Sequence, residues 1–166
     1  MVNYNQFCIS NDVAYNVYKA LNYCFENCRV TDNRARGMLL ASRGKTVIKN
    51  NYFHTSGAAI KFESDGKFWF ESGGTNDVLI CGNVFDACKF SASPQTVIYV
   101  SPREKTEEGR YFHKKIAICN NEFKGCHGDL VYMDNTEEFI FTENKITDQK
   151  YGIYTVNHCK SVKTDI

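Results

Sequence analysis

Three carboxylates and a tryptophan stand close together in one polar stretch of the sequence. Glu63, Asp65 and Glu71 flank or follow the aromatic run 68–70, whose central residue is Trp69. Aromatic rings can stack on the C–H faces of a sugar, while carboxylates accept hydrogen bonds from its hydroxyl groups. Two carboxylates can also carry glycoside hydrolysis, one as the acid and the other as the base or nucleophile. The three acids are therefore candidate catalytic residues and Trp69 a candidate sugar-binding residue; solvated loop acids and a structural aromatic cover are the alternatives.

Three basic side chains are further candidates for binding a substrate. Arg34 and Arg36 precede Gly37 in a predicted turn. Arginine can hold a carboxylate or a sugar hydroxyl, and it can equally fix a loop acid such as Glu63 by bidentate pairing, which we favour. His54 follows an apolar residue on another turn and is included as a candidate, with a simple polar turn residue as the alternative. No cofactor is implied.

An internal repeat supplies the elements that would position these residues. The stretch 47–53, Val-Ile-Lys-Asn-Asn-Tyr-Phe, recurs at 78–85, 116–123 and 139–146, with a weaker copy at 23–30. Each copy is an apolar strand with alternating faces, followed by a polar turn. The shortest spacing between copies is 23 residues, and insertions lengthen the others. Such a period is typical of a solenoid.

Coiling the chain with one repeat per turn stacks equivalent residues about 4.8 Å apart. The aligned asparagines could then bond one another in a ladder, as stacked asparagines do in cross-β assemblies; these are Asn51, Asn83, Asn121 and Asn144. A second strand follows each turn, introduced by glycine in four of the five copies. We predict an all-β, single-domain, right-handed parallel β-helix of about five rungs over residues 23–166. An antiparallel sandwich is the alternative.

Residues 1–22 are expected to form an N-terminal cap or a partial rung. Ser10 is a plausible helix N-cap, and Val13, Val17 and Leu21 have helical spacing, which favours a short capping helix over an irregular strand. At the other end, residues 161–166 resemble the first strand of a further rung. An open last rung would expose unpaired backbone. We therefore expect missing rungs, or a partner such as a second copy of the chain, to cover it.

Charge and composition bound the partners. Lys and Arg total 20 against 19 Asp and Glu, so the net charge of +1 gives no argument for nucleic acid or a membrane surface. No apolar run approaches the roughly 20 residues that cross a bilayer. The start of the sequence lacks the basic and apolar regions of a signal peptide, which leaves localisation open.

The eight cysteines fit the repeat. Cys81 aligns with Cys119, and Cys88 aligns with Cys126, which favours small free thiols stacked in neighbouring rungs. Some disulfides, or a metal site, are the alternatives. The Cys-His pairs at 126–127 and 158–159 lack a Cys-x-x-Cys arrangement, so we predict no metal site.

Two connections are much longer than the rest, namely 63–76 and 101–115. Insertions in a solenoid project as loops and often form its binding face. Both leave the same corner of consecutive rungs, so we expect them to lie side by side and to hold the functional site.

Three segments carry a resemblance to a known family. They are Arg-Ala-Arg-Gly-Met-Leu-Leu at 34–40, Ser-Gly-Ala-Ala-Ile at 56–60 and Trp-Phe-Glu-Ser-Gly at 69–73. From about Asn22 to Ile153 the chain resembles the β-helical exo-α-1,3-galactosidases of gut and marine bacteria, which remove terminal galactose from blood-group-B-like ends. The resemblance implies the C-terminal part of such a β-helix, from a secreted or periplasmic parent enzyme acting on a galactoside-containing glycan.

The match covers the candidate acids unevenly. Glu71 fits the family pattern closely, whereas Glu63 and Asp65 fit it less well. The family also carries an upstream Asp-Asp-x-x-Asn-x-His-Gly segment that is absent from this sequence, which implies an incomplete active site in this chain. A non-catalytic carbohydrate-binding or scaffold β-helix is the alternative function. A pectate-lyase-like enzyme ranks third, because the clustered aspartates that would bind calcium are not evident.

Overall fold

The computed structural model describes residues 7–10, 13–16, 21–64, 73–91, 95–102, 106 and 109–166. Within these ranges every regular element is a β-strand. Apart from one hairpin, the strands form three parallel sheets. None of the described residues belong to a helix that is long and apolar enough to span a bilayer.

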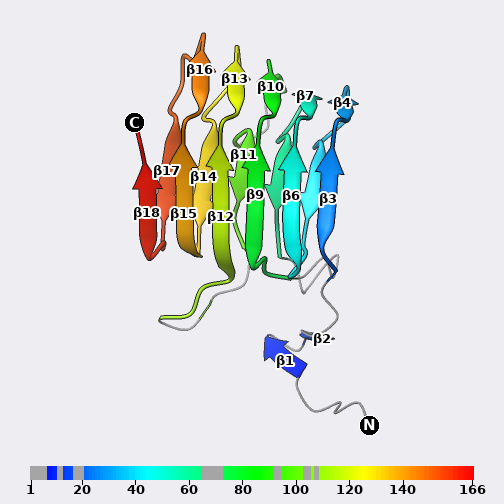
Figure 1. Ribbon diagram of the computed structural model, residues 1–166, viewed down its shortest axis with the longest axis vertical. Helices are drawn as coiled ribbons and strands as arrows, with labels where there is room; N and C mark the ends of the chain where they lie inside the picture. Colours follow the sequence, from blue (N-terminus) through cyan, green and yellow to red (C-terminus); the bar gives the residue numbers. More distant parts are fainter. Residues whose placement is uncertain are drawn as a thin grey trace.

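The three sheets, called I, II and III here, run side by side along the molecule (Figure 1). Sheet I contains β3 (Tyr23–Glu26), β6 (Lys45–Lys49), β9 (Asp77–Cys81), β12 (His113–Cys119), β15 (Thr136–Thr142) and β18 (Ser161–Thr164). Sheet II contains β4 (Arg29–Thr31), β7 (Tyr52–His54), β10 (Val84–Asp86), β13 (Glu122–Lys124) and β16 (Lys145–Thr147). Sheet III contains β5 (Met38–Leu40), β8 (Ile60–Phe62), β11 (Ile98–Val100), β14 (Val131–Asp134) and β17 (Tyr154–Asn157).

The chain visits sheets I, II and III in turn and then starts again, which makes a right-handed parallel β-helix. Among the described strands five rungs are complete, namely β3–β5, β6–β8, β9–β11, β12–β14 and β15–β17, and β18 adds a further strand to sheet I. The predicted fold class is thus confirmed. The sequence predicted two strands per rung, whereas the structure has three. The strand that was missed is the three-residue strand of sheet II, which is too short to show a period.

A column of stacked rings fills the interior beneath sheet II. Phe85 is the register partner of Phe53 and of Phe123 in the neighbouring rungs. Its ring stacks on theirs at centroid distances of 5.2 Å and 4.7 Å, and all three side chains are buried. The repeated apolar residue after each asparagine turn therefore packs on its own equivalents in the adjacent rungs.

The aligned asparagines bond one another along the turn between sheets I and II. The side-chain Nδ2 of Asn51 donates to Oδ1 of Asn83 at 3.0 Å, and Asn83 donates in the same way to Asn121 at 2.9 Å. Asn121 donates to Asn144 at 3.0 Å, so the row spans four rungs. The backbone N–H of Asn51 also donates to Asn83 Oδ1, at 2.9 Å. Each turn is thereby tied to the next by side-chain and main-chain bonds.

The corner between sheets II and III brings neighbouring backbones into close contact. A Cβ atom placed on Gly57 would lie 1.8 Å from the carbonyl oxygen of Ala35 in the preceding rung. Real atoms do not approach so closely. Glycine is therefore required at this corner by the spacing between rungs, and not by the positive φ that a bend might suggest.

The seven cysteines whose side chains are described, all but Cys8, are free thiols. Cys81 pairs in register with Cys119 on the outer face of sheet I. Cys88 and Cys126 are buried at the corner after sheet II, where each Sγ donates to a main-chain carbonyl of the preceding rung. The pKa of Cys88 is raised, first by the hydrogen bond with the Cys126 thiol and then by desolvation.

The expected capping helix is wrong for the described residues near the N-terminus. β1 (Phe7–Ser10) and β2 (Val13–Asn16) pair as an antiparallel hairpin, with Ser10 opposite Val13. Larger apolar residues alternate with smaller or polar ones along each four-residue strand, and such period-two alternation competes directly with helical spacing over so short a stretch. The next part of the expected helix, residues 17–20, lies outside the described residues.

Candidate functional site

The outer face of sheet III presents one side chain per rung at the middle of each strand. Strand residues alternate between faces, and the flanking residues Ile60 and Phe62 are fully buried in the interior. The outward residues are in register across the sheet; they are Leu39, Lys61, Tyr99, Tyr132 and Thr155.

A buried ion pair lies on this face. The Nζ of Lys61 is 2.6 Å from Oε2 of Glu63, and the two side chains are only 7% and 9% exposed. Lys61 is the middle residue of β8, and Glu63 directly follows the end of that strand. Two charges this well removed from water are costly unless they pair closely. The pair therefore fixes a carboxylate and an ammonium group beside one another where the first long connection begins.

Two tyrosines continue the face next to this pair. Tyr99 is the register partner of both Lys61 and Tyr132. The two tyrosine rings stack at a centroid distance of 5.3 Å with an interplanar angle of 23°. Asn157 Nδ2 donates to the hydroxyl of Tyr132 at 3.0 Å and holds it in place. A carboxylate, an ammonium group and two aromatic rings thus occupy adjacent rungs of one surface.

The ends of the two long connections lie side by side before sheet I. The backbone N–H of Lys114 donates to the carbonyl of Thr75 at 2.8 Å, and Thr75 Oγ1 is 3.0 Å from Nδ1 of His113. The two long connections, which were predicted to lie side by side, are therefore neighbours in the parts that the structure describes. Burial lowers the pKa of His113 to about 3, and the positive charge of Arg43 adds to the effect. His113 is consequently a neutral packing residue that also touches Phe62 edge to face.

The structure brings together only part of the predicted site. Of the candidate acids, Glu63 directly follows β8 and pairs with Lys61 of the outer face of sheet III, while Asp65 and Glu71, like Trp69, lie outside the described residues. Lys61 and both tyrosines were not predicted from the sequence. A signal for them was available, since every second residue of a predicted strand shares a face.

The predicted arginines belong to a different corner. Arg34 and Arg36 lie between β4 and β5, before the strands of sheet III, whereas Glu63 follows β8 at the far end of those strands. The hydroxyl of Ser56 donates to the backbone carbonyl of Arg34 at 2.7 Å, which fixes this turn on the next rung. The backbones of the two arginines are thus not beside Glu63.

His54 lies on another sheet. Its Nδ1 is 2.8 Å from the backbone oxygen of Asp86, to which it donates, and its ring stacks on Phe90 at a centroid distance of 5.1 Å. His54 is on sheet II, so the structure does not bring it to the face that carries Glu63.

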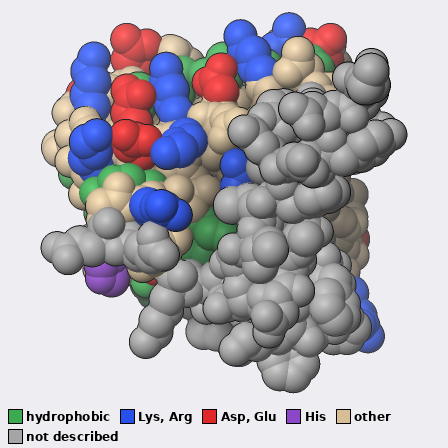
Figure 2. Space-filling view, turned by 90° about the horizontal axis from the view of Figure 1, so that it is seen from below, with side chains coloured by type: hydrophobic (Ala, Val, Ile, Leu, Met, Phe, Trp, Pro, Cys, Tyr) green, Lys and Arg blue, Asp and Glu red, His purple; other side chains and the backbone are tan. Residues whose placement is uncertain are grey.

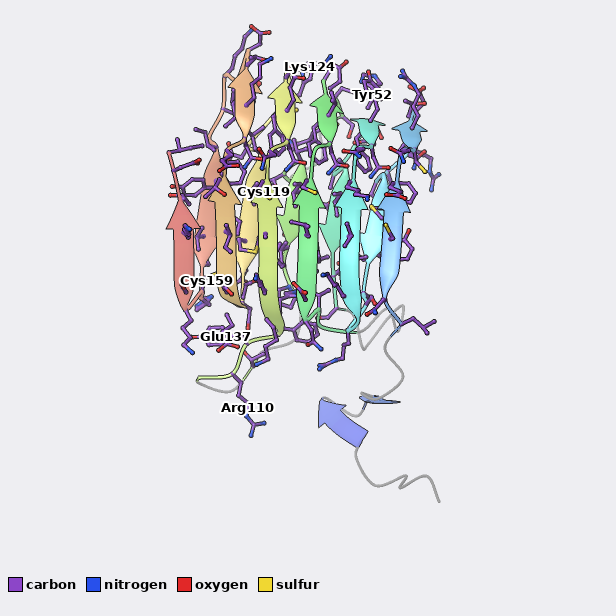
Figure 3. The ribbon with its side chains drawn as sticks, in the orientation of Figure 1. Tyr52, Arg110, Cys119, Lys124, Glu137 and Cys159 are labelled. Atoms are coloured by element: carbon purple, nitrogen blue, oxygen red, sulfur yellow. The ribbon has the colours of Figure 1, made fainter. Side chains whose placement is uncertain are left out.

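The outer face of sheet II holds a polar cluster that the sequence did not indicate. The hydroxyl of Tyr52 donates to Oδ2 of Asp86 at 2.7 Å, and Lys124 Nζ is 3.2 Å from the same oxygen. Partial burial alone would raise the pKa of Asp86, but the bonds from Tyr52 and Lys124 outweigh it and lower that pKa. The guanidinium of Arg29 lies 4.0 Å from the centroid of the Tyr52 ring. Figure 3 shows Tyr52 and Lys124 among the short strands, far from Arg110 on the second long connection.

Replacing Tyr52 by phenylalanine tests whether this cluster is structural. The Tyr52→Phe change removes the hydrogen bond to Asp86 but keeps the ring beneath Arg29, so we expect a loss of about 1 kcal/mol of unfolding free energy. Urea unfolding followed by circular dichroism would measure it. Tyr99→Phe is the matched control, because it removes a hydroxyl from the neighbouring sheet. Equal midpoints for the wild type and Tyr52→Phe would contradict the prediction.

Charged side chains at the beginnings of the sheet I strands pair across rungs. Glu137 accepts from Lys114 at 3.2 Å and from Lys160 at 3.0 Å, and these lysine bonds lower the pKa of Glu137, with the bond from Lys160 the larger influence. Figure 2 shows the resulting alternation of basic and acidic side chains. Glu137 thus links lysines of the two neighbouring turns of the chain. Across the residues that the structure describes, no three His, Cys, Asp or Glu side chains gather as metal ligands would.

Comparison with known proteins agrees with this architecture. A family model described as a right handed β-helix region matches residues 1–165. The chain belongs to this family.

Within the family, the chain is similar to several curated enzymes. It is 39% identical over 119 residues to α-1,3-galactosidase A of Shewanella woodyi, which covers 72% of this chain and 19% of that protein. It is 35% identical over 148 residues to α-1,3-galactosidase B of Bacteroides thetaiotaomicron, and this match covers 82% of this chain and 24% of that protein. It is 37% identical over 123 residues to α-1,3-galactosidase A of Bacteroides fragilis, and this match covers 72% of this chain and 20% of that protein.

These relatives confirm the resemblance drawn from the sequence motifs. The matched region is about a fifth to a quarter of the length of each relative. The chain thus corresponds to one section of the proteins it resembles.

Proposed function

We propose that this chain is a section of an enzyme that hydrolyses terminal α-galactosides, and that the outer face of sheet III contributes to its sugar site. The observation that carries the proposal is the buried Lys61–Glu63 pair beside Tyr99, at the edge where the first long connection begins. The names of the similar proteins supply the class of sugar.

The described side chains suit the recognition of a pyranose ring. Glu63 and Lys61 are almost fully buried, so in this proposal they form the polar base of the site, where the carboxylate can accept a hydrogen bond and the ammonium group can donate one. The stacked rings of Tyr99 and Tyr132 offer an aromatic surface for the C–H face of a sugar, fixed by the bond from Asn157. Such a mixture of aromatic surface with a few polar groups is typical of small-ligand sites.

The catalytic step requires two carboxylates. In this proposal Glu71 and Glu63 take the acid and base roles, with Asp65 as the further candidate and Trp69 as a stacking residue of the same connection. Arg34, Arg36 and His54 are left out of the site, because their backbones lie at another corner or on another sheet.

A second candidate function is a non-catalytic carbohydrate-binding or scaffold β-helix. The close pairing of Glu63 with Lys61 favours it, because a carboxylate engaged at 2.6 Å is less available to a reacting atom. The two functions differ in turnover: release of galactose from α-1,3-galactobiose supports the enzyme, and saturable binding without release supports the scaffold.

A titration of tryptophan fluorescence tests the sugar site. Trp69 is the only tryptophan, so its emission reports on the first long connection. We expect saturable changes with galactose and α-1,3-galactobiose and none with oligogalacturonate. No response to any of these sugars would contradict the proposal.

A double variant tests the part played by the ion pair. Removing one charge would leave the other buried without a partner, so Lys61→Met and Glu63→Gln are combined. We expect at least a tenfold weaker affinity for the galactosides, with the melting temperature nearly kept. The matched control combines Lys145→Met with Glu122→Gln, which removes an exposed pair at 2.8 Å on sheet II. Equal affinities for the two double variants would exclude the ion pair from the site.

A further inference from the structure

A hollow lies at the corner between sheets II and III, at the opposite end of the sheet III strands from Glu63. It has a volume of about 490 Å³ and extends over the third, fourth and fifth rungs. Small-molecule sites commonly occupy about 300–1,000 Å³. Its lining includes Lys89, Phe90, Thr96, His127, Asp129 and Tyr151.

The hollow arises from unequal corners. Eleven residues, 87–97, separate β10 from β11, whereas six residues, 125–130, separate β13 from β14. The corner of the fifth rung, 148–153, is equally short. The longer corner of the third rung therefore borders a surface where the next two corners turn tightly.

Gly128 keeps part of this surface open. Its φ of 146° is one that side chains rarely adopt, and an added Cβ would lie 2.8 Å from Cδ and Nζ of Lys89. The Lys89 chain instead lies across the glycine and donates from Nζ to the backbone carbonyl of His127 at 3.3 Å. A cationic group is thereby fixed at the edge of the hollow.

Two aromatic rings line the hollow and stay accessible. Phe90 is 46% exposed and Tyr151 is 57% exposed, whereas the stacked rings of Phe53, Phe85 and Phe123 in the interior are buried. The ring of Phe90 is held by stacking on His54, which in turn bonds the backbone of Asp86. An exposed ring fixed from behind is prepared to stack on a ligand.

The polar groups of the hollow are oriented by main-chain bonds. Oδ1 of Asp129 accepts from the N–H of Gly152 at 2.8 Å, and no bond to Oδ2 is found among the described residues. Gln149 Nε2 donates to the carbonyl of Gly128 at 2.9 Å and joins the two short corners. Asp129 Oδ2 can accept a hydrogen bond from a hydroxyl group. The ring of His127, which is exposed, can donate or accept a hydrogen bond.

We propose that this hollow is a second saccharide-binding site, which takes a neutral hexose unit stacked on Tyr151 and Phe90 and hydrogen-bonded to Asp129. Exposed rings combined with a fixed carboxylate suit a ligand that has both C–H faces and hydroxyl groups. A purely apolar ligand would offer no hydrogen-bond donor to Asp129 Oδ2, and the charges of Asp129 and Lys89 oppose each other, so the lining favours neither an anion nor a cation. The site goes beyond the proposed function, because it is separated from Lys61 and Glu63 by the length of the sheet III strands.

The backbone N–H groups of Gly128 and Gly152, observed by NMR, report directly on this site. Titration of the ¹⁵N-labelled chain with galactose, glucose and α-1,3-galactobiose should shift the N–H resonances of Gly128 and Gly152 with a common saturation curve. The Tyr151→Ala and Asp129→Asn variants should each weaken that curve at least tenfold. The amide introduced by Asp129→Asn would retain a carbonyl oxygen for Gly152, and Tyr151 is mostly exposed, so both variants should fold.

The control for the acid is Asp32→Asn, at the same corner of the first rung. It should leave the titration unchanged. Trp69 fluorescence in the Tyr151→Ala variant should still respond to galactosides, which separates this site from the one at Glu63. Absence of saturable shifts at Gly128 and Gly152 with all three sugars would overturn the proposal, as would wild-type affinity in both variants.

Discussion

The Asn83→Ala variant is expected to lose about 4 kcal/mol of unfolding free energy, since each buried polar group left without a partner costs about 1–3 kcal/mol. Asn83 is buried, and its Nδ2 donates to Asn121 Oδ1 and to the carbonyl of Ile48, both at 2.9 Å. Its Oδ1 accepts from the backbone and the side chain of Asn51. Alanine would remove one hydrogen bond from each of these groups at once, although Asn121 Oδ1 keeps the bond from the backbone N–H of residue 83 and Asn51 Nδ2 keeps its bond to the Phe25 carbonyl.

Urea unfolding followed by circular dichroism would measure the loss. The matched control is Asn22→Ala, because Asn22 is exposed and its Oδ1 accepts from the N–H of Lys45 at 3.0 Å. We expect that control to lose less than about 1 kcal/mol. Similar losses for the two variants would show that the asparagine row does not hold the rungs together.

His113 is expected to make the protein sensitive to acid. Its pKa is about 3 in the folded chain, because burial and the charge of Arg43 disfavour the protonated ring, against a usual value near 6.5. A depressed histidine pKa means that the unfolded chain binds more protons between these values. The contribution of neutral His113 to the free energy of unfolding is therefore complete above about pH 6.5. It is lost as the pH falls, by about 1.4 kcal/mol per pH unit. Between pH 7 and pH 4 the loss from His113 alone should be about 3 kcal/mol.

Unfolding free energies measured at pH 7 and pH 4 would test this. In the His113→Gln variant an amide can still accept from Thr75. The loss of unfolding free energy between pH 7 and pH 4 should be smaller in this variant than in the wild type, by about 3 kcal/mol. Carboxylates such as Asp86 and Glu137, whose pKa values are lowered, also lose stability in acid, but they are common to every variant. His127→Gln, which removes an exposed histidine, should decline like the wild type. A decline in His113→Gln equal to that of the wild type would contradict the assignment.

The repeat made the fold predictable from sequence. Phe53, Phe85 and Phe123 occupy one register column because each follows its asparagine by two residues, and in a solenoid sequence alignment becomes spatial alignment. The short strands of sheet II and the hairpin at 7–16 were missed. Over three or four residues, alternation, helical spacing and irregular backbone give nearly the same pattern.

The site was less predictable than the fold. Glu63 could be chosen by its chemical type, but its pairing with Lys61 at 2.6 Å depends on side-chain conformations that the repeat does not encode. Arg36 and His54 are near Glu63 in sequence yet lie at another corner and on another sheet. Asp65, Trp69 and Glu71 stay predictions.

The long corner of the third rung places the two proposed sites close together. Each rung touches only its two neighbours. β11 lies beside Lys61 through Tyr99, and Thr96, just before β11, lines the hollow at the corner between sheets II and III. Thr96 Oγ1 also accepts from the N–H of Tyr132 at 3.0 Å. Within the third rung the two proposed sites are therefore no more than a short strand apart.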